Sequence, residues 1–131
     1  MVSPVPTSRI TTAYGARGYY WSCNEDSRGR GVHTGVDYSA RIGTPVVAAI
    51  AGTIRHRNYG RAFGNHQFAI SPSPGQPFAN DEVFYAHCRT RLPDGMEVQV
   101  GQRVAEVGAE GNVTGPHLHF EYHAGKNFWA C

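Results

Sequence analysis

Short apolar segments broken by turn residues are the feature that most restricts the fold of this 131-residue chain. It contains 16 glycines and 8 prolines, and no segment keeps a helical period over three turns. Instead, alternating or continuously apolar stretches of strand length end at Gly or Pro, which is typical of short strands joined by turns. The sequence therefore predicts an all-β fold with few or no helices, in one domain that occupies residues 1–131.

Several strands can be located from these patterns. They are predicted at residues 45–54, 65–70, 82–88 and 117–123, with two shorter strands on either side of Gly101. Residues 71–77 are predicted to be a loop, because three prolines cannot take part in a strand ladder. In the strand at 82–88, alternation places Val83, Tyr85 and His87 on the same face.

The composition argues against two classes of protein. A formal net charge of +2, with the basic residues scattered along the chain, is not the footprint of a nucleic-acid-binding protein. No apolar run approaches the ~18 residues of a membrane-spanning helix. The first ten residues also lack the charged and apolar regions of a secretory signal peptide. We therefore expect no nucleic-acid partner, no membrane span and no signal peptide.

The three cysteines, Cys23, Cys88 and Cys131, are widely spaced. Since no two of them form a C-x-x-C pair, neither a structural zinc knuckle nor a thioredoxin-type site is predicted. Three cysteines allow at most one internal disulfide. The sequence leaves open whether Cys23 pairs with Cys88 or whether Cys88 is a buried thiol.

Seven histidines in a chain of this length are unusual. Three of them, together with Asp37, fall into two short patterns. The first is H-x-x-x-D, with His33 and Asp37, which we place on a loop that enters a strand. The second is H-x-H, with His117 and His119 in a predicted strand. Residues two apart in a strand share a face, so His117, His119 and Glu121 should project together.

Two imidazole nitrogens and one carboxylate oxygen make a three-ligand zinc set. Three protein ligands with an open fourth position are typical of a catalytic zinc site, where zinc lowers the pKa of water from about 15.7 to about 7. The spacing does not decide which histidine of H-x-H is the ligand. Glu121 could orient a ligand imidazole or could be an exposed strand residue. The remaining histidines, His56, His66 and His123, are expected to be surface or packing residues.

Three blocks of the sequence resemble the motifs of the lysostaphin-type (LytM-type) zinc peptidases, which are peptidoglycan endopeptidases. The blocks are HTGVDYSARIGTPVVAA, VFYAHC and VGQRVAEVGAEGNVTGPHLHFE, and they occur in family order. The resemblance extends from about Ile10 to Tyr122. It implies a small antiparallel β-sheet with a groove across it, one Zn²⁺ per chain, a peptide of bacterial peptidoglycan as substrate, action at the cell wall, and a monomer.

The resemblance also implies roles for five residues. His33, Asp37 and His119 correspond to the zinc ligands, and His87 and His117 to the catalytic histidines. One catalytic histidine would take a proton from the attacking water, and the other would stabilise the developing oxyanion. No H-E-x-x-H motif is present, so no glutamate base is expected from that source.

Other functions remain possible at this stage. The favoured setting is the catalytic domain of a phage endolysin, with a secreted wall hydrolase as runner-up. A catalytically silent domain of the same fold could instead bind or activate a partner, but it would have no chemical need for all five site residues. A phosphocarrier domain of sugar uptake has a similar fold and active histidines, but it needs no H-x-x-x-D zinc set.

Overall fold

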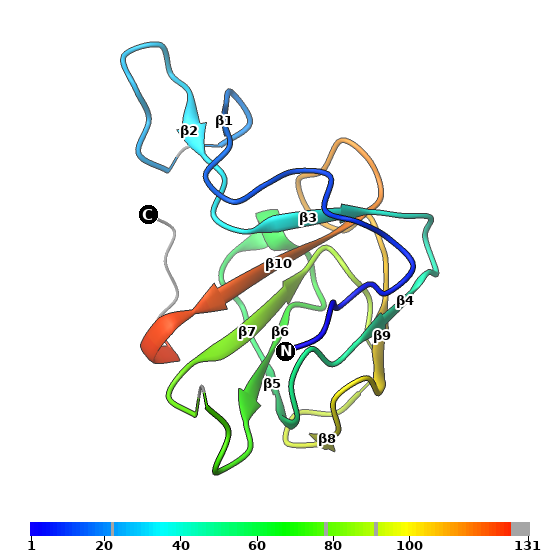
Figure 1. The fold of residues 1–131 in the computed structure, drawn as a ribbon. Coiled ribbons are helices and arrows are strands. Elements are labelled where there is room, and N and C mark those ends of the chain that lie inside the picture. The colour runs from blue at the N-terminus through cyan, green and yellow to red at the C-terminus, as the bar shows by residue number, and fades with distance from the viewer. Residues whose placement is uncertain (22, 78, 91, 127–131) are drawn as a thin grey trace.

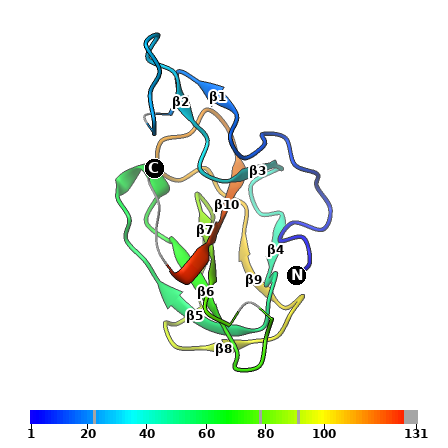
Figure 2. The ribbon, with the colours of Figure 1, turned by 60° about the vertical axis from the view of Figure 1, so that its left-hand side comes forward.

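The computed structural model describes residues 1–21, 23–77, 79–90 and 92–126 (Figures 1 and 2). These residues form strands β1 to β10 and two short 3-10 helices, η1 (Arg61–Phe63) and η2 (Ala124–Lys126). No α-helix occurs among them, which confirms the all-β prediction. Within the same residues, neither helix has the length and apolar character needed to cross a membrane.

The largest element is a six-stranded antiparallel sheet in the order β3-β10-β7-β6-β5-β8. Its strands are β3 (Val36–Ser39), β10 (His117–His123), β7 (Glu82–Ala86), β6 (Phe68–Pro72), β5 (Gly52–His56) and β8 (Glu97–Val98). Two small antiparallel sheets complete the fold: β1 (Arg17–Gly18) with β2 (Gly31–Val32), and β4 (Pro45–Val47) with β9 (Arg103–Glu106). The β1–β2 hairpin projects beyond β3, away from the large sheet (Figure 1).

The alternation of side chains in β7 and β10 separates a core face from a second face. Val83, Tyr85, Leu118 and Phe120 belong to the buried apolar cluster. Burial of each such side chain stabilises the fold by about 1.5–3 kcal/mol. The Tyr85 hydroxyl also donates to the carbonyl of Val47 at 3.1 Å, which joins the large sheet to β4. The core therefore fixes β10, and with it the side chains on its opposite face.

The prediction of one strand over residues 45–54 is wrong. The chain forms β4 in one sheet and β5 in another, and the buried residues 48–50 with the half-buried Ala51 connect them. A Cβ atom at Gly52 would lie 2.0 Å from the carbonyl oxygen of Ser71, so glycine allows strands β5 and β6 to approach each other here. Apolar character alone could not reveal this break, since the connection is as buried as the strands.

Two other boundaries differ from the predictions. The strand predicted at 65–70 begins at Phe68 and continues to Pro72, so the loop predicted at 71–77 is wrong for its first two residues. Pro72 is the last residue of β6 and lies beyond Phe68–Ile70, the part of this strand that pairs with β7. By contrast, β10 has the predicted bounds, and β8 and β9 lie on either side of Gly101 as predicted.

The predicted orientation of His87 is also wrong. β7 ends at Ala86, and His87 has a left-handed backbone with φ of 62°. The reversal places the His87 ring near His119, on the face opposite Tyr85, and Cys88 then returns to the core. Cys88 is a buried free thiol and does not pair with Cys23. Burial raises the pKa of this thiol to about 12. Cys131 lies outside the described residues.

Candidate metal centre and active site

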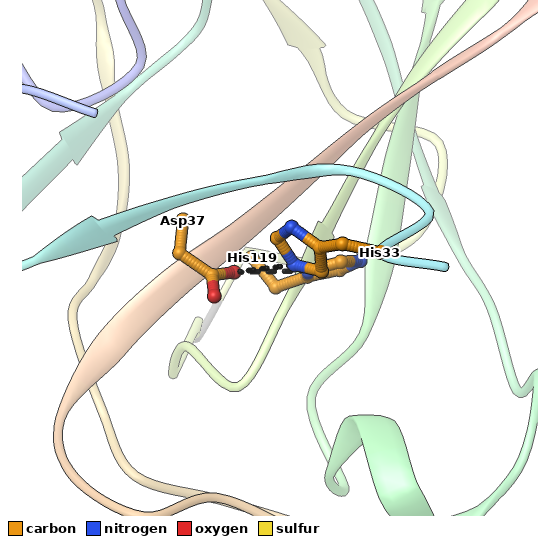
Figure 3. A group of neighbouring side chains, drawn as sticks. All are labelled: His33, Asp37 and His119. Carbon is orange, nitrogen blue, oxygen red and sulfur yellow. Dashed lines mark hydrogen bonds and ion pairs between the residues drawn. The ribbon is translucent and has the colours of Figure 1, made fainter. Parts of the chain in front are cut away.

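His33, Asp37 and His119 come together at the edge of the large sheet, as Figure 3 shows. Asp37 lies in β3 directly opposite His119 in β10. His33 precedes β3, and its main chain bonds to the N-terminal segment through the carbonyl of Ala16 at 2.8 Å and the N–H of Gly15 at 2.9 Å. Strand pairing and the N-terminal segment thus bring together residues that lie up to 86 positions apart in the sequence.

The three donor atoms form a nearly equilateral triangle. Nε2 of His33 lies 3.2 Å from Oδ1 of Asp37. Nδ1 of His119 lies 3.1 Å from the same oxygen and 3.2 Å from Nε2 of His33. With bonds of about 2.0–2.1 Å, two ligand atoms of a tetrahedral zinc ion are separated by about 3.3 Å. The cluster therefore fits three corners of a zinc site.

Hydrogen bonds behind the two imidazoles determine which nitrogen faces the centre. His33 Nδ1 donates to the carbonyl of Ala13 at 3.0 Å, which leaves Nε2 for a metal ion. His119 Nε2 donates to Oε2 of Glu121 at 2.6 Å, which leaves Nδ1. Such partners fix the tautomer and orientation of ligand histidines.

Glu121 is buried, so the interpretation of this residue as an exposed strand glutamate is wrong; its carboxylate accepts a hydrogen bond from the His119 ring, as the alternative interpretation requires. Its carboxylate also accepts hydrogen bonds from Thr34 Oγ1 at 2.8 Å and from Nε2 of His123 at 2.8 Å. His123 is buried and stacks on Phe84, in agreement with its prediction as a packing residue. Glu121 therefore links the metal centre to the interior of the domain.

The charges in this cluster depend on one another. Burial disfavours the charged form of His119, but its hydrogen bonds to Asp37 and Glu121 outweigh that effect and raise its pKa to about 9. Burial would raise the pKa of Asp37, but hydrogen bonds to His119 and His33 hold it well below its usual range. Burial likewise opposes the ionised form of Glu121, whereas His119 and His123 lower its pKa to about 2. The centre thus favours positive charge between two carboxylates.

His87 and His117 lie beside the cluster with their ring centroids 4.8 Å apart. His87 Nδ1 donates to the carbonyl of Glu110 at 2.6 Å, and His117 Nδ1 donates to that of Gly115 at 2.9 Å. In the neutral form of each ring, Nε2 is therefore the nitrogen without a proton. Nε2 of His117 lies 3.6 Å from Oδ1 of Asp37. Burial lowers the pKa of His87 to about 4, so that its ring is neutral at neutral pH.

Aromatic rings enclose the site. Trp21 stacks on His33 with a centroid distance of 4.8 Å. Phe63, from η1, lies 6.2 Å from the ring of His87 and 5.9 Å from that of His119. Neither Trp21 nor Phe63 was predicted at the site, because no local pattern connects either residue to a histidine that is distant in the sequence.

The two remaining histidines lie at the surface, as predicted. His56 bonds through Nε2 to the carbonyl of Leu92, and His66 bonds through Nδ1 to the carboxylate of Glu110. The structure therefore brings together all five residues that the family resemblance singled out, and it leaves His56 and His66 outside the cluster.

Known proteins share this sequence pattern and this fold. A model of peptidase family M23 matches residues 31–128. The peptidoglycan DD-endopeptidase ShyC of Vibrio cholerae is 36% identical over 92 residues, which are 69% of this chain and 20% of that protein. The DD-carboxypeptidase/endopeptidase Mpg of Neisseria gonorrhoeae is 32% identical over 124 residues, 92% of this chain and 25% of that protein. The chain thus spans a quarter or less of these relatives.

Solved structures agree with the sequence matches. The catalytic domain of lysostaphin from Staphylococcus simulans superposes with a TM-score of 0.74 at 26% identity, over 96% of this chain and 86% of that one. A zinc-containing peptidase from Vibrio cholerae gives a TM-score of 0.73 at 26% identity, over 98% of this chain and 38% of that one. Together with the match to residues 31–128, these similarities show that the chain belongs to peptidase family M23 and is a metallopeptidase of the lysostaphin type.

Proposed function

We propose that this chain is a zinc-dependent endopeptidase that hydrolyses peptide crosslinks of bacterial peptidoglycan and acts at the cell wall. The observation that carries the proposal is the triangle of donor atoms from His33, Asp37 and His119, with separations of 3.1–3.2 Å, beside the rings of His87 and His117. The names of ShyC and Mpg, which are endopeptidases, support the reaction class.

Zinc would be held by Nε2 of His33, Oδ1 of Asp37 and Nδ1 of His119. Bound there, it would supply a Lewis acid to the scissile carbonyl and increase the acidity of water. The N–H of His119 that donates to Glu121 would keep the ligand imidazole in the required tautomer and orientation.

Proton transfer would be the task of His87 and His117. One Nε2 accepts the proton of the attacking water, and the other histidine, once protonated, donates a hydrogen bond to the developing oxyanion. Both rings suit these roles because each Nδ1 is already committed to a main-chain carbonyl. A positioned base contributes about 10²- to 10⁴-fold to the rate. Since a histidine can serve as this base, no carboxylate base is required.

The substrate would be an extended peptide crosslink, either a D-Ala to diaminopimelate bond or a glycine bridge. The test is digestion of purified walls of both types by the zinc-loaded protein, followed by mass spectrometry of the released muropeptides. We expect crosslinked species to disappear from at least one wall type, and His119→Ala to leave them intact. Absence of cleavage in every wall type, with zinc bound, would overturn the proposal in favour of a silent domain of the same fold.

The biological setting that we propose is the catalytic part of a phage endolysin, and a secreted wall hydrolase is the second possibility. Both would use the same chemistry on the same polymer. Lysis from within a host cell that co-expresses a phage holin would support the first setting.

A further inference from the structure

Glu110 contacts the active site through its main chain and a neighbouring loop through its side chain. Its carbonyl accepts the Nδ1–H of His87 at 2.6 Å. Its carboxylate lies 2.8 and 2.9 Å from Nδ1 of His66 and accepts the main-chain N–H of Asn65 at 3.2 Å. Arg89 forms a longer ion pair with the same carboxylate, at 3.6 Å. The side chain of Glu110 is only 21% exposed, which is unusual for a glutamate that takes no part in the metal cluster.

The two loops that Glu110 joins, residues 57–67 and 107–116, also meet through their main chains. The N–H of Asn112 donates to the carbonyl of Ala62 at 2.9 Å. A Cβ atom on Gly111 would lie 2.2 Å from that carbonyl, and one on Gly64 would lie 2.7 Å from Cβ of Glu110. The main chains of the two loops therefore leave no room for a side chain at Gly64 or Gly111. The Glu110 carboxylate joins the second loop to Asn65 and His66 in the first.

His87 depends on both loops for its position. Its backbone N–H donates to the carbonyl of Phe63 in the first loop at 3.0 Å, and its ring donates to Glu110 in the second. Its backbone is left-handed, with φ of 62°, a conformation that is unfavourable for a residue with a Cβ atom. Such a conformation persists only where the surrounding structure holds it.

We propose that Glu110 is a positioning residue for His87, which rests on the proposed role of His87 in proton transfer. The bond between its carboxylate and His66 fixes the loop, and the fixed carbonyl holds the proton of His87 on Nδ1. Nε2 is then the nitrogen that is free to accept a proton. Within the described residues, the polar contacts of Glu110 reach none of the three metal-donor atoms, so we assign it an action through His87.

The first test follows the imidazole protons themselves. Two-dimensional ¹H–¹⁵N spectra of the zinc-loaded protein identify the protonated nitrogen of each histidine. The wild-type protein should give His87 as the Nδ1–H form. In Glu110→Ala we expect this signal to shift toward a mixture of the two tautomers, whereas His33 and His119 keep their signals and zinc stays bound. This readout does not require that the protein cleaves peptidoglycan.

The second test uses the rate of crosslink cleavage. Glu110→Ala should lower kcat by about 10- to 100-fold, as expected for misplacement of a catalytic group by a fraction of an ångström to 1 Å, with a smaller change in KM. His66→Ala should cause part of this loss. His66→Asn should restore the rate, because the Asn amide N–H₂ can donate to the Glu110 carboxylate from nearly the position of Nδ1. Glu106→Gln is the matched control, since Glu106 pairs with Arg103 at the surface and should not affect the rate.

The outcomes separate this proposal from the proposed function. A Glu110→Ala protein that keeps the wild-type His87 tautomer and rate would overturn it, as would a loss of zinc in proportion to the loss of rate. If Glu110→Ala does not fold, the pair His66→Ala and His66→Asn decides, and equal effects of the two would overturn the proposal. If the wild-type protein cleaves no wall, the proposed function fails, while the spectra still test whether Glu110 holds His87.

Discussion

Nε2 of His119 lies 2.6 Å from Oε2 of Glu121, two residues further along β10, and both side chains are buried. Because side chains two apart share one face of a strand, β10 supplies the imidazole of a proposed metal ligand and its hydrogen-bond partner together. The core residues Leu118 and Phe120 occupy the other face and anchor the strand. The hydrogen bonds of its two nitrogens orient the His119 ring between the carboxylates of Asp37 and Glu121.

We predict that Glu121→Gln weakens zinc binding by about 10- to 100-fold, the usual effect of removing a partner of a ligand histidine. The amide keeps the size of the side chain, so the fold should persist. Competition with a chromophoric chelator measures the affinity. Glu97→Gln, at an exposed position of β8, is the control and should bind zinc as the wild type does. An unchanged affinity in Glu121→Gln would contradict this account of the centre.

Substitution of the five site residues should separate ligands from proton-transfer groups. His33→Ala, Asp37→Ala and His119→Ala each leave two donors, so zinc should be lost and the melting temperature should fall. His87→Ala and His117→Ala keep all three donors and should keep zinc, but their rates should fall by about 10²- to 10⁴-fold. Elemental analysis and wall lysis are measured for each variant. If His117→Ala loses zinc and His119→Ala retains it, the assignment within H-x-H is reversed.

The stability of the chelator-treated protein should decrease as the pH rises from about 6.5 to about 9. The pKa of His119 is about 9 in the folded chain and 6.5 as the reference value, so in this range the folded form binds more protons than the unfolded form. The contribution of His119 is complete below pH 6.5 and is lost as the pH passes 9. His87, with a lowered pKa, is neutral in the folded state and loses its proton in the unfolded state as the pH rises past 6.5, so it opposes the decrease only at the lower end of this range.

Thermal melts in chelator at several pH values test this expectation. The zinc-loaded protein should behave in the opposite sense, since ligands must lose their protons before they bind metal. His119→Ala should remove the decrease in the chelated protein. A melting temperature that stays constant or rises between pH 6.5 and 9 without metal would show that His119 is not held between two carboxylates.

Gly35, between the two residues of H-x-x-x-D, should not tolerate a side chain. A Cβ atom there would lie 2.5 Å from the carbonyl oxygen of Phe120 and 2.9 Å from Cε1 of His119. Gly35→Ala should therefore push β10 away, lower stability by about 1–3 kcal/mol and weaken zinc binding. Gly115→Ala is the control, because nothing lies within 4 Å of its added Cβ. Denaturant titration and zinc affinity are measured for both, and equal behaviour would contradict the close approach.

The sequence by itself determined the strand class, the extent of β10 and, through the family motifs, the five residues that gather at the site. These features depend on local information: the alternation of side chains, the turn residues and the spacing within short motifs. Alternation holds only while a strand stays regular, however, and for this reason the sequence placed His87 on the wrong face. The left-handed backbone at that residue reverses the side chain, and no neighbour in the sequence indicates it.

Only the tertiary structure decided that Glu121 is buried, that residues 45–54 divide between two sheets, and that Glu110 meets His87 and His66. Each of these facts depends on segments that are far apart in the chain and become neighbours through strand pairing. A glutamate in a strand is compatible with either exposure or burial until its cross-strand partners are known. Pairing of β10 with β3 and β7 supplied those partners, because free energy gained from long-range contacts, and not local propensity, selects among the alternatives that the sequence leaves open.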